Sequence, residues 1–107
     1  MRAIPHPALK DVTLTQVLYA LSDPVRLGVV RQLSQEGQST CSALDGGRPK
    51  SSMSHHFKIL RGAGLVRTVI KGTEHINSLR LSELEERFPS VLSSILRSLT
   101  PVESPVG

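Results

Sequence analysis

The stretch that decides the fold is KSSMSHHFKILRGAGLV, residues 50–66. Met53, Phe57 and Leu60 recur at i, i+4 and i+7, a spacing that puts them on one face of a helix. The pattern predicts a helix from about Ser51 to Ala63. Gly64 is expected to end it, because glycine readily adopts the backbone conformation found just after a helix. The residues pointing away from the apolar face are small or polar, namely Ser51, Ser52, Ser54, His55, Lys58 and Arg61.

The adjacent histidines at 55 and 56 raise the question of a metal site or a catalytic pair. Neighbouring helical residues point about 100° apart, and helical metal pairs prefer the spacing i, i+4. We therefore predict different roles for the two rings. His55 should face outward, either toward a ligand or simply toward solvent, whereas His56 should sit at the edge of the apolar face, hydrogen-bonded and structural.

The segment before this helix predicts its partner. In SDPVRLGVVRQLSQEG, residues 22–37, Asp23 can cap a helix, Pro24 suits its first position, and Gly37 can end it. Leu27, Val30 and Leu33 are expected to form its buried stripe. A short helix over 39–45 and a GGRP turn follow. Helices joined by a tight turn, the last with a basic outer face, predict a helix-turn-helix whose final helix, about 20 Å long, fits a DNA major groove.

Two β-rich runs, LVRTVIK and EHINSLRL, follow and are joined around Gly72-Thr73. They predict a hairpin wing, in which Arg67 and Lys71 would contact the DNA backbone beside the helix. Ser82 and Glu85 fit a capping box for a further helix, which Pro89 interrupts. The fold class is therefore mainly α with a β-hairpin wing (α+β).

We expect a single folded domain between an N-terminal arm and a C-terminal tail. Residues 1–12 are expected to form an extended arm, residues 13–99 the folded domain, and residues 100–107 a flexible tail. Thr13 and Gln16 form a capping-box pattern before a helix over 14–21. A chain of 107 residues has the usual length of one domain.

Charge favours a polyanionic partner. Residues 48–80 contain seven basic residues and one acidic residue, a net charge of +6, whereas the rest of the chain carries −2. A solvated basic surface is the alternative. The sequence shows no apolar run long enough for a membrane span and no secretory signal, so we expect a cytoplasmic protein. We find no catalytic constellation or phosphate loop, and we predict no enzyme activity and no cofactor.

The combined motifs resemble the ArsR-type winged-helix repressors of bacteria. The similarity spans residues 13–99 and includes Asp23 to Leu27 (D-P-x-R-L) and the S-x-H-F-x-x-L-x-x-A-G-L pattern that starts at Ser54. It implies a homodimer in which the first and last helices pair across a two-fold axis. An alternative is that both helices only complete the core of one chain. The dimer residues expected are Leu14, Val17, Leu18, Leu21, Leu92, Ile95, Leu96 and Leu99.

Metal sensing, which the resemblance would allow, is not expected. The family's thiolate site needs a pair of cysteines, but Cys41 is the only cysteine here, and the last helix has no histidine. A single cysteine also excludes an internal disulfide and a four-cysteine zinc site. Cys41 lies near the start of a short helix, which favours a reactive thiolate, and a redox role is one hypothesis. A small buried apolar cysteine is the alternative, and a small-molecule or redox inducer stays open.

The functional hypothesis is a sequence-specific transcriptional regulator, a repressor that binds a palindromic operator in double-stranded DNA as a homodimer. Side chains from Lys50 to Lys58 would read bases, and Arg61, Arg67 and Lys71 would contact phosphates. The alternative is a winged-helix protein-interaction module without sequence-specific DNA binding.

Overall fold

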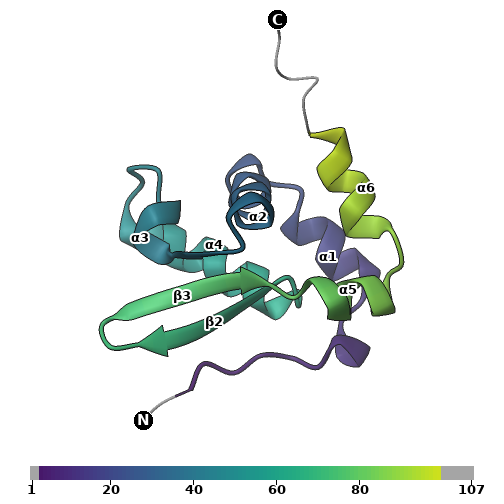
Figure 1. The fold of residues 1–107 in the computed structure, drawn as a ribbon, viewed down its shortest axis with the longest axis horizontal. Helices are drawn as coiled ribbons and strands as arrows, with labels where there is room; N and C mark the ends of the chain where they lie inside the picture. The colour runs from purple at the N-terminus through teal and green to yellow at the C-terminus, as the bar shows by residue number, and fades with distance from the viewer. Residues whose placement is uncertain (1–2, 100–107) are drawn as a thin grey trace, which may run out of the picture.

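The computed structural model describes residues 3–99 and shows a winged helix-turn-helix (Figure 1). After a 3-10 turn, η1 (Leu9–Asp11), the helices are α1 (Leu14–Ala20), α2 (Pro24–Glu36), α3 (Cys41–Leu44), α4 (Lys50–Gly62), α5 (Leu81–Arg87) and α6 (Val91–Ser98). The strands are β1 (Gln38–Thr40), β2 (Val66–Lys71) and β3 (Glu74–Leu79). The sheet lies along one side of the helices, and α6 stands at the opposite end from the wing.

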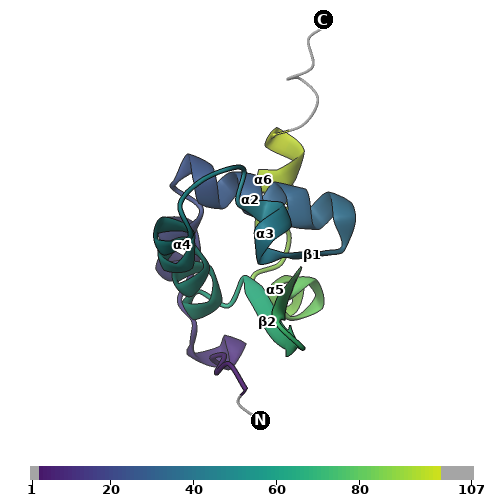
Figure 2. The ribbon, with the colours of Figure 1, turned by 90° about the vertical axis from the view of Figure 1, so that its left-hand side faces the viewer.

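The predicted hairpin is present as β2 and β3, which pair antiparallel from Val66 opposite Leu79 to Lys71 opposite Glu74. Gly72 makes the turn with a positive φ of 61°. A third strand, β1, pairs antiparallel with the other edge of β3 and gives the sheet order β1-β3-β2. Figure 2 shows β1 leading directly into α3.

The prediction of one short helix over 39–45 is therefore wrong at its start. Residues 38–40 are extended, and α3 begins only at Cys41. The Thr40 side-chain oxygen accepts a hydrogen bond from the backbone N–H of Ala43 at 3.1 Å. Thr40 is thus both the last paired residue of β1 and the N-cap of α3.

The caps of the first two helices are confirmed. Thr13 and Gln16 form a reciprocal capping box on α1, and the Asp23 carboxylate accepts from the N–H groups of Val25 and Arg26. The capping box predicted at Ser82 and Glu85 is wrong, because α5 starts at Leu81 without a side-chain cap. The Glu85 carboxylate instead accepts from the N–H of Ser90, at the break that Pro89 makes before α6.

The core forms where α2 and α4 meet the sheet. Met53, Phe57 and Leu60 are buried as predicted, as are Val30 and Leu33 of α2. Leu27 is only half-buried, and the residue that continues the stripe one turn before Val30 is Arg26, at 5% exposure. Helix α2 therefore directs a charged side chain into the domain.

The N-terminal arm is built into the fold and is not extended throughout. Residues 3–8 run along β2 at the bottom of Figure 1, and η1 then places Leu9 in the core beside Val12. Arg80 donates to the carbonyl of Pro7 at 2.8 Å, and Arg87 donates to those of Leu9 and Val12 at 3.1 and 3.0 Å. The ring Nε2 of His6 accepts the N–H of Thr68, on the outer edge of β2, at 3.0 Å. The predicted tail, residues 100–107, lies outside the described residues.

Gly64 is predicted to be irreplaceable. It ends α4 with φ of 75°, and a β-carbon there would lie 3.2 Å from methyl groups of Leu9 and Val12. Gly64→Ala should lower the free energy of unfolding by more than the roughly 1–2 kcal/mol that a left-handed backbone costs a non-glycine residue. Urea unfolding measures this. Gly28→Ala is the control, since Gly28 is helical with open space around it, and should raise stability by up to about 1 kcal/mol. Equal effects would contradict the close approach.

A second prediction concerns pH. Burial, and then the charges of Arg67, Arg80 and Arg61, lower the pKa of His6 below its ordinary 6.5. The folded chain thus binds fewer protons at this ring than the unfolded chain. The stability from neutral His6 is present above pH 6.5 and is lost as the pH falls from 6.5 through the lower folded pKa.

Urea unfolding at about pH 7.5 and about pH 5.5 should show this loss in the wild type. His6→Gln should reduce the difference, because the glutamine oxygen can accept the Thr68 N–H and is not protonated. His75→Gln, which replaces an exposed imidazole in the wing, is the matched control and should keep it. The same pH dependence in His6→Gln as in the wild type would contradict the assignment.

Candidate nucleic-acid interface

The outward face of α4 is polar and basic. Because the stripe Met53–Phe57–Leu60 is buried, helical geometry turns the opposite side to solvent. The predicted contact residues that are exposed on this helix are Lys50, Ser51, Ser52, Ser54, His55 and Lys58. No acidic residue occurs between Lys50 and Gly62. This face combines small side chains, which allow close approach, with positive charge.

Two residues of this predicted set are arranged differently. The Ser52 hydroxyl donates to the carbonyl of Pro49 at 3.0 Å, so it is engaged at the start of its own helix. Arg61 is half-buried on a flank of α4, near enough to the arm for its charge to act on His6. The central outward positions are therefore Ser51, Ser54, His55 and Lys58.

The wing brings its two predicted basic residues to different surroundings. Lys71 is exposed at the end of β2, next to the turn. Arg67 lies at the base of the hairpin and donates to the Glu83 carboxylate at 3.1 Å. Glu83 also binds Arg80, and the hydrogen bonds from Arg80 lower the pKa of Glu83 to about 2. Arg67 is thus paired with an acid, whereas Lys71 is exposed near the tip of the wing.

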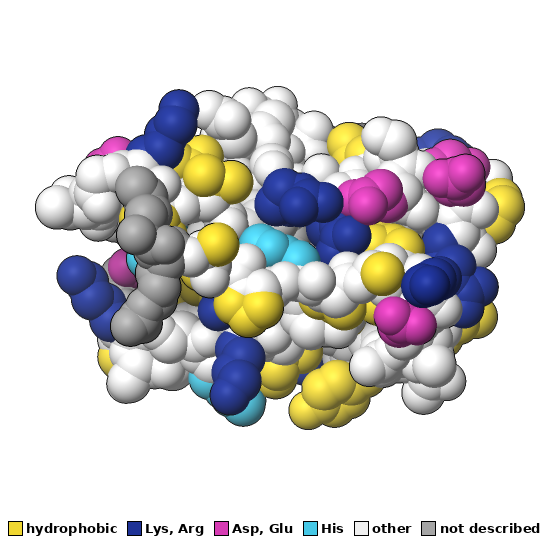
Figure 3. Space-filling view, turned by 90° about the horizontal axis from the view of Figure 1, so that it is seen from below, with side chains coloured by type: hydrophobic (Ala, Val, Ile, Leu, Met, Phe, Trp, Pro, Cys, Tyr) yellow, Lys and Arg dark blue, Asp and Glu magenta, His cyan; other side chains and the backbone are white. Residues whose placement is uncertain are grey.

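The face seen from below shows how these charges are distributed (Figure 3). Most of the visible Asp and Glu side chains gather toward the α5 end, and Lys and Arg predominate toward the wing. Glu74 is an exception, because it is exposed at the wing tip opposite Lys71.

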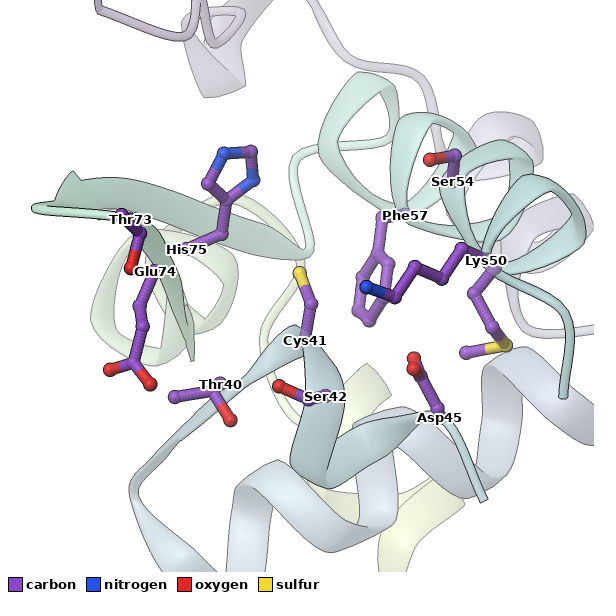
Figure 4. Close-up of a pocket in the computed structure, with 11 residues that line it drawn as sticks. Thr40, Cys41, Ser42, Asp45, Lys50, Ser54, Phe57, Thr73, Glu74 and His75 are labelled. Atoms are coloured by element: carbon purple, nitrogen blue, oxygen red, sulfur yellow. The ribbon is translucent and has the colours of Figure 1, made fainter. Parts of the chain in front are cut away.

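A cleft of about 280 Å³ separates the wing tip from α4. Lys50 and Phe57 line one side, His75 and Glu74 the other, and Cys41 of α3 lies between the two sides (Figure 4). Cys41 is half-buried, and its sulfur accepts a hydrogen bond from the side-chain amide of Asn77 at 3.2 Å. The redox role of Cys41 stays a prediction.

His56 lies at the edge of the apolar face and is hydrogen-bonded, as predicted. Its ring is half-buried, and Nδ1 is 3.2 Å from the guanidinium of Arg26 and 4.0 Å from the Asp23 carboxylate. Sequence reasoning missed Arg26. The available signal was its position, since residues 26, 30 and 33 share the i, i+4, i+7 stripe of α2.

The predicted dimer residues divide into two groups. On α1, Leu14 and Leu18 are 42% and 47% exposed, whereas Val17 and Leu21 are 1% and 7% exposed. Assigning Val17 and Leu21 to a dimer surface is therefore wrong, because they already belong to the core of one chain, and the same correction applies to Leu92. Three residues of the last helix region keep partly exposed side chains: Ile95, Leu96 and Leu99.

Within residues 3–99, no group of three or more His, Cys, Asp and Glu side chains is placed to hold a metal ion. None of the helices in that part of the chain is long and apolar enough to cross a membrane.

Comparison with known proteins agrees with this geometry. A family described as a helix-turn-helix domain matches residues 21–69. The chain is 34% identical over 92 residues to the uncharacterized HTH-type transcriptional regulator YceK of Bacillus subtilis. The aligned region covers 83% of this chain and 88% of that protein. The crystal structure of the ArsR family transcriptional regulator RHA00566 is 26% identical, with a TM-score of 0.63, over 87% of this chain and 93% of that one.

The chain belongs to the ArsR-type helix-turn-helix transcriptional regulators. It is a DNA-binding transcriptional regulator, which favours the DNA-binding hypothesis over the protein-interaction module. The homodimeric winged helix-turn-helix DNA-binding domain of Mb0332 from Mycobacterium bovis has the same fold. Its TM-score is 0.63 at 19% identity, over 88% of this chain and 87% of that one.

Proposed function

We propose that this regulator is a repressor that binds a palindromic operator as a homodimer, with α4 in the major groove. The observation that carries the proposal is the outward face of α4, which is basic and rich in small hydroxyl side chains, together with the exposed Lys71 near the tip of the wing. A helix fits the major groove of B-DNA, and short polar side chains there can reach base edges.

The contacts fall into two classes. Ser51, Ser54 and His55, at the centre of the outward face, are the residues proposed to read bases. Lys50, Lys58 and Lys71 are proposed to bind phosphates on either side of the groove. Arg67 would have to leave Glu83 to join them, so we assign it a smaller share of the binding free energy.

A homodimer is supported by the apolar surface that α1 and α6 leave exposed. Leu14 and Leu18 have large exposed fractions, and Ile95, Leu96 and Leu99 are only partly covered. Large exposed apolar side chains that cluster on one surface are typical of a protein–protein contact. A second copy of the chain would cover this surface and hold two α4 helices at a fixed separation. Occupying a promoter in this way would block transcription.

The proposal predicts a symmetric site. Footprinting of the purified chain on genomic DNA should recover a palindrome with half-sites roughly 34 Å, or one helical turn, apart. A duplex with both half-sites should be bound by two chains, and competition with scrambled duplex should not displace them. Leu18→Lys should weaken the dimer and the binding to the full palindrome together, since it places a charge at an exposed apolar position. A chain that stays monomeric at working concentration and binds both duplexes equally would contradict the proposal.

The role of Lys58 has its own prediction. Lys58→Ala should weaken binding by a similar factor on specific and scrambled duplexes and reduce the slope of log K against log salt by about one per chain. Lys10→Ala is the matched control. It also removes one exposed positive charge, but Lys10 lies near Glu83 and Glu86, remote from the wing tip, and its slope should stay at the wild-type value. Equal slopes for the two variants would place Lys58 outside the phosphate contacts.

A further inference from the structure

Arg26 is a buried charge whose guanidinium joins three segments of the chain. Its Nε donates to the carbonyl of Ala20 at 2.7 Å, and Nη2 donates to the carbonyl of Tyr19 at 3.2 Å, both at the end of α1. Nη1 lies 3.2 Å from Nδ1 of His56 on α4. A residue near the start of α2 thus connects the last turn of α1 with the middle of the helix that faces DNA.

The chemistry of this contact sets the direction of its hydrogen bond. A guanidinium has only donors, so in a hydrogen bond with Arg26 the Nδ1 of His56 is the acceptor. The charged groups that face this ring are Arg26 and the Asp23 carboxylate, 4.0 Å from Nδ1, while the neighbouring His55 ring is 6.1 Å away. A hydrogen bond from a charged donor is among the stronger ones a side chain can make.

The direction of the bond matters as much as its strength. The apolar contacts of Met53, Phe57 and Leu60 hold α4 against the core, but such contacts depend little on direction. Within residues 3–99, the contact between Arg26 and His56 is the one side-chain hydrogen bond that ties α4 to another helix or to the sheet. It is therefore suited to fix how α4 is rotated about its own axis.

We infer that Arg26 and His56 are positioning residues for sequence recognition: their bond fixes the rotation of α4 so that Ser51, Ser54 and His55 meet base edges in register. This inference rests on the proposed function. The same guanidinium lies 5.2 Å from the centre of the Tyr19 ring on α1, the helix that carries the exposed Leu14 and Leu18. Arg26 therefore links the rotation of α4 to α1, the helix that is proposed to contact the second chain.

Three single variants and one double variant test the inference. His56→Leu has no acceptor at the Nδ1 position, whereas His56→Asn places an amide oxygen there and can restore the bond. Arg26→Lys keeps the charge but has a single ammonium in place of the fork that reaches three acceptors. The double variant Arg26→Lys with His56→Leu completes a double-mutant cycle. Binding to the footprinted operator and to scrambled duplex is measured for each, at a temperature where thermal unfolding shows that every variant is folded.

His56→Leu should lose about tenfold in operator affinity and little on scrambled duplex, so the ratio of the two affinities falls. His56→Asn should recover most of that ratio. Arg26→Lys should lower it too, and the double variant should be no worse than the more affected single variant. A variant that was merely less stable would bind both duplexes less well, without a change in their ratio.

A readout without DNA separates failure of this inference from failure of the proposed function. Amide hydrogen exchange in α4 should be faster in His56→Leu than in wild type and return toward wild type in His56→Asn. Suppose that the wild type prefers its operator. Unchanged exchange in His56→Leu, or a ratio of operator to scrambled-duplex affinity that is the same in His56→Leu as in the wild type, would then overturn the inference and leave the proposed function intact. A wild type without operator preference would overturn the proposed function, and the inference about recognition with it.

Discussion

The rotation of α4 is the constraint on which the rest of the structure depends. Met53, Phe57 and Leu60 are almost completely buried, and they occupy one side of a helix of thirteen residues. Since successive residues point about 100° apart, burying these three leaves Ser51 and Lys58 on the opposite side. A shift by one residue would move the hydroxyl and basic groups toward the core and apolar groups toward solvent. The hydrophobic effect therefore sets which side of α4 faces outward, and the bond between Arg26 and His56 is inferred to fix the finer rotation of the helix about its axis. None of the apolar residues is expected to contact DNA, although they determine which face is proposed to bind it.

The elements with local signals could be predicted, and those with remote partners could not. The stripe of α4, the caps at Thr13 and Asp23, and the hairpin turn at Gly72 each depend on residues a few positions apart. Strand β1 has only three residues, and it exists because residues 38–40 meet the free edge of β3 at residues 76–78. No periodicity within three residues can reveal that. The Ser82 cap failed for a related reason, because α5 begins one residue before it, at Leu81, and residue 80 takes the cap position without a side-chain bond.

The candidate site divides in the same way. Helical phase was enough to place Ser51, Ser54, His55 and Lys58 outward. It could not show that Arg67 meets Glu83, sixteen residues later, or that Arg61 lies near His6 of the arm. The dimer residues illustrate another limit, since a stripe at i, i+3, i+4 and i+7 marks apolar positions without saying what covers them. Leu14 and Val17 share that stripe, yet one is 42% exposed and the other 1%.

The arginines show why net charge is a poor measure of the surface that a polyanion would meet. Residues 48–80 carry a formal +6, but Arg80 is 6% exposed and bound to Glu83 and the arm, and Arg67 shares the same carboxylate. These two guanidinium groups hold remote segments together, as Arg26 and Arg87 do elsewhere, because one planar fork can bind several carbonyl or carboxylate oxygens at once. The lysines, with compact heads on flexible stems, remain exposed on α4 and at the wing tip. Arg26, Arg67, Arg80 and Arg87 thus serve to assemble the fold, and the positive charge that faces outward from α4 and the wing tip comes mainly from lysine.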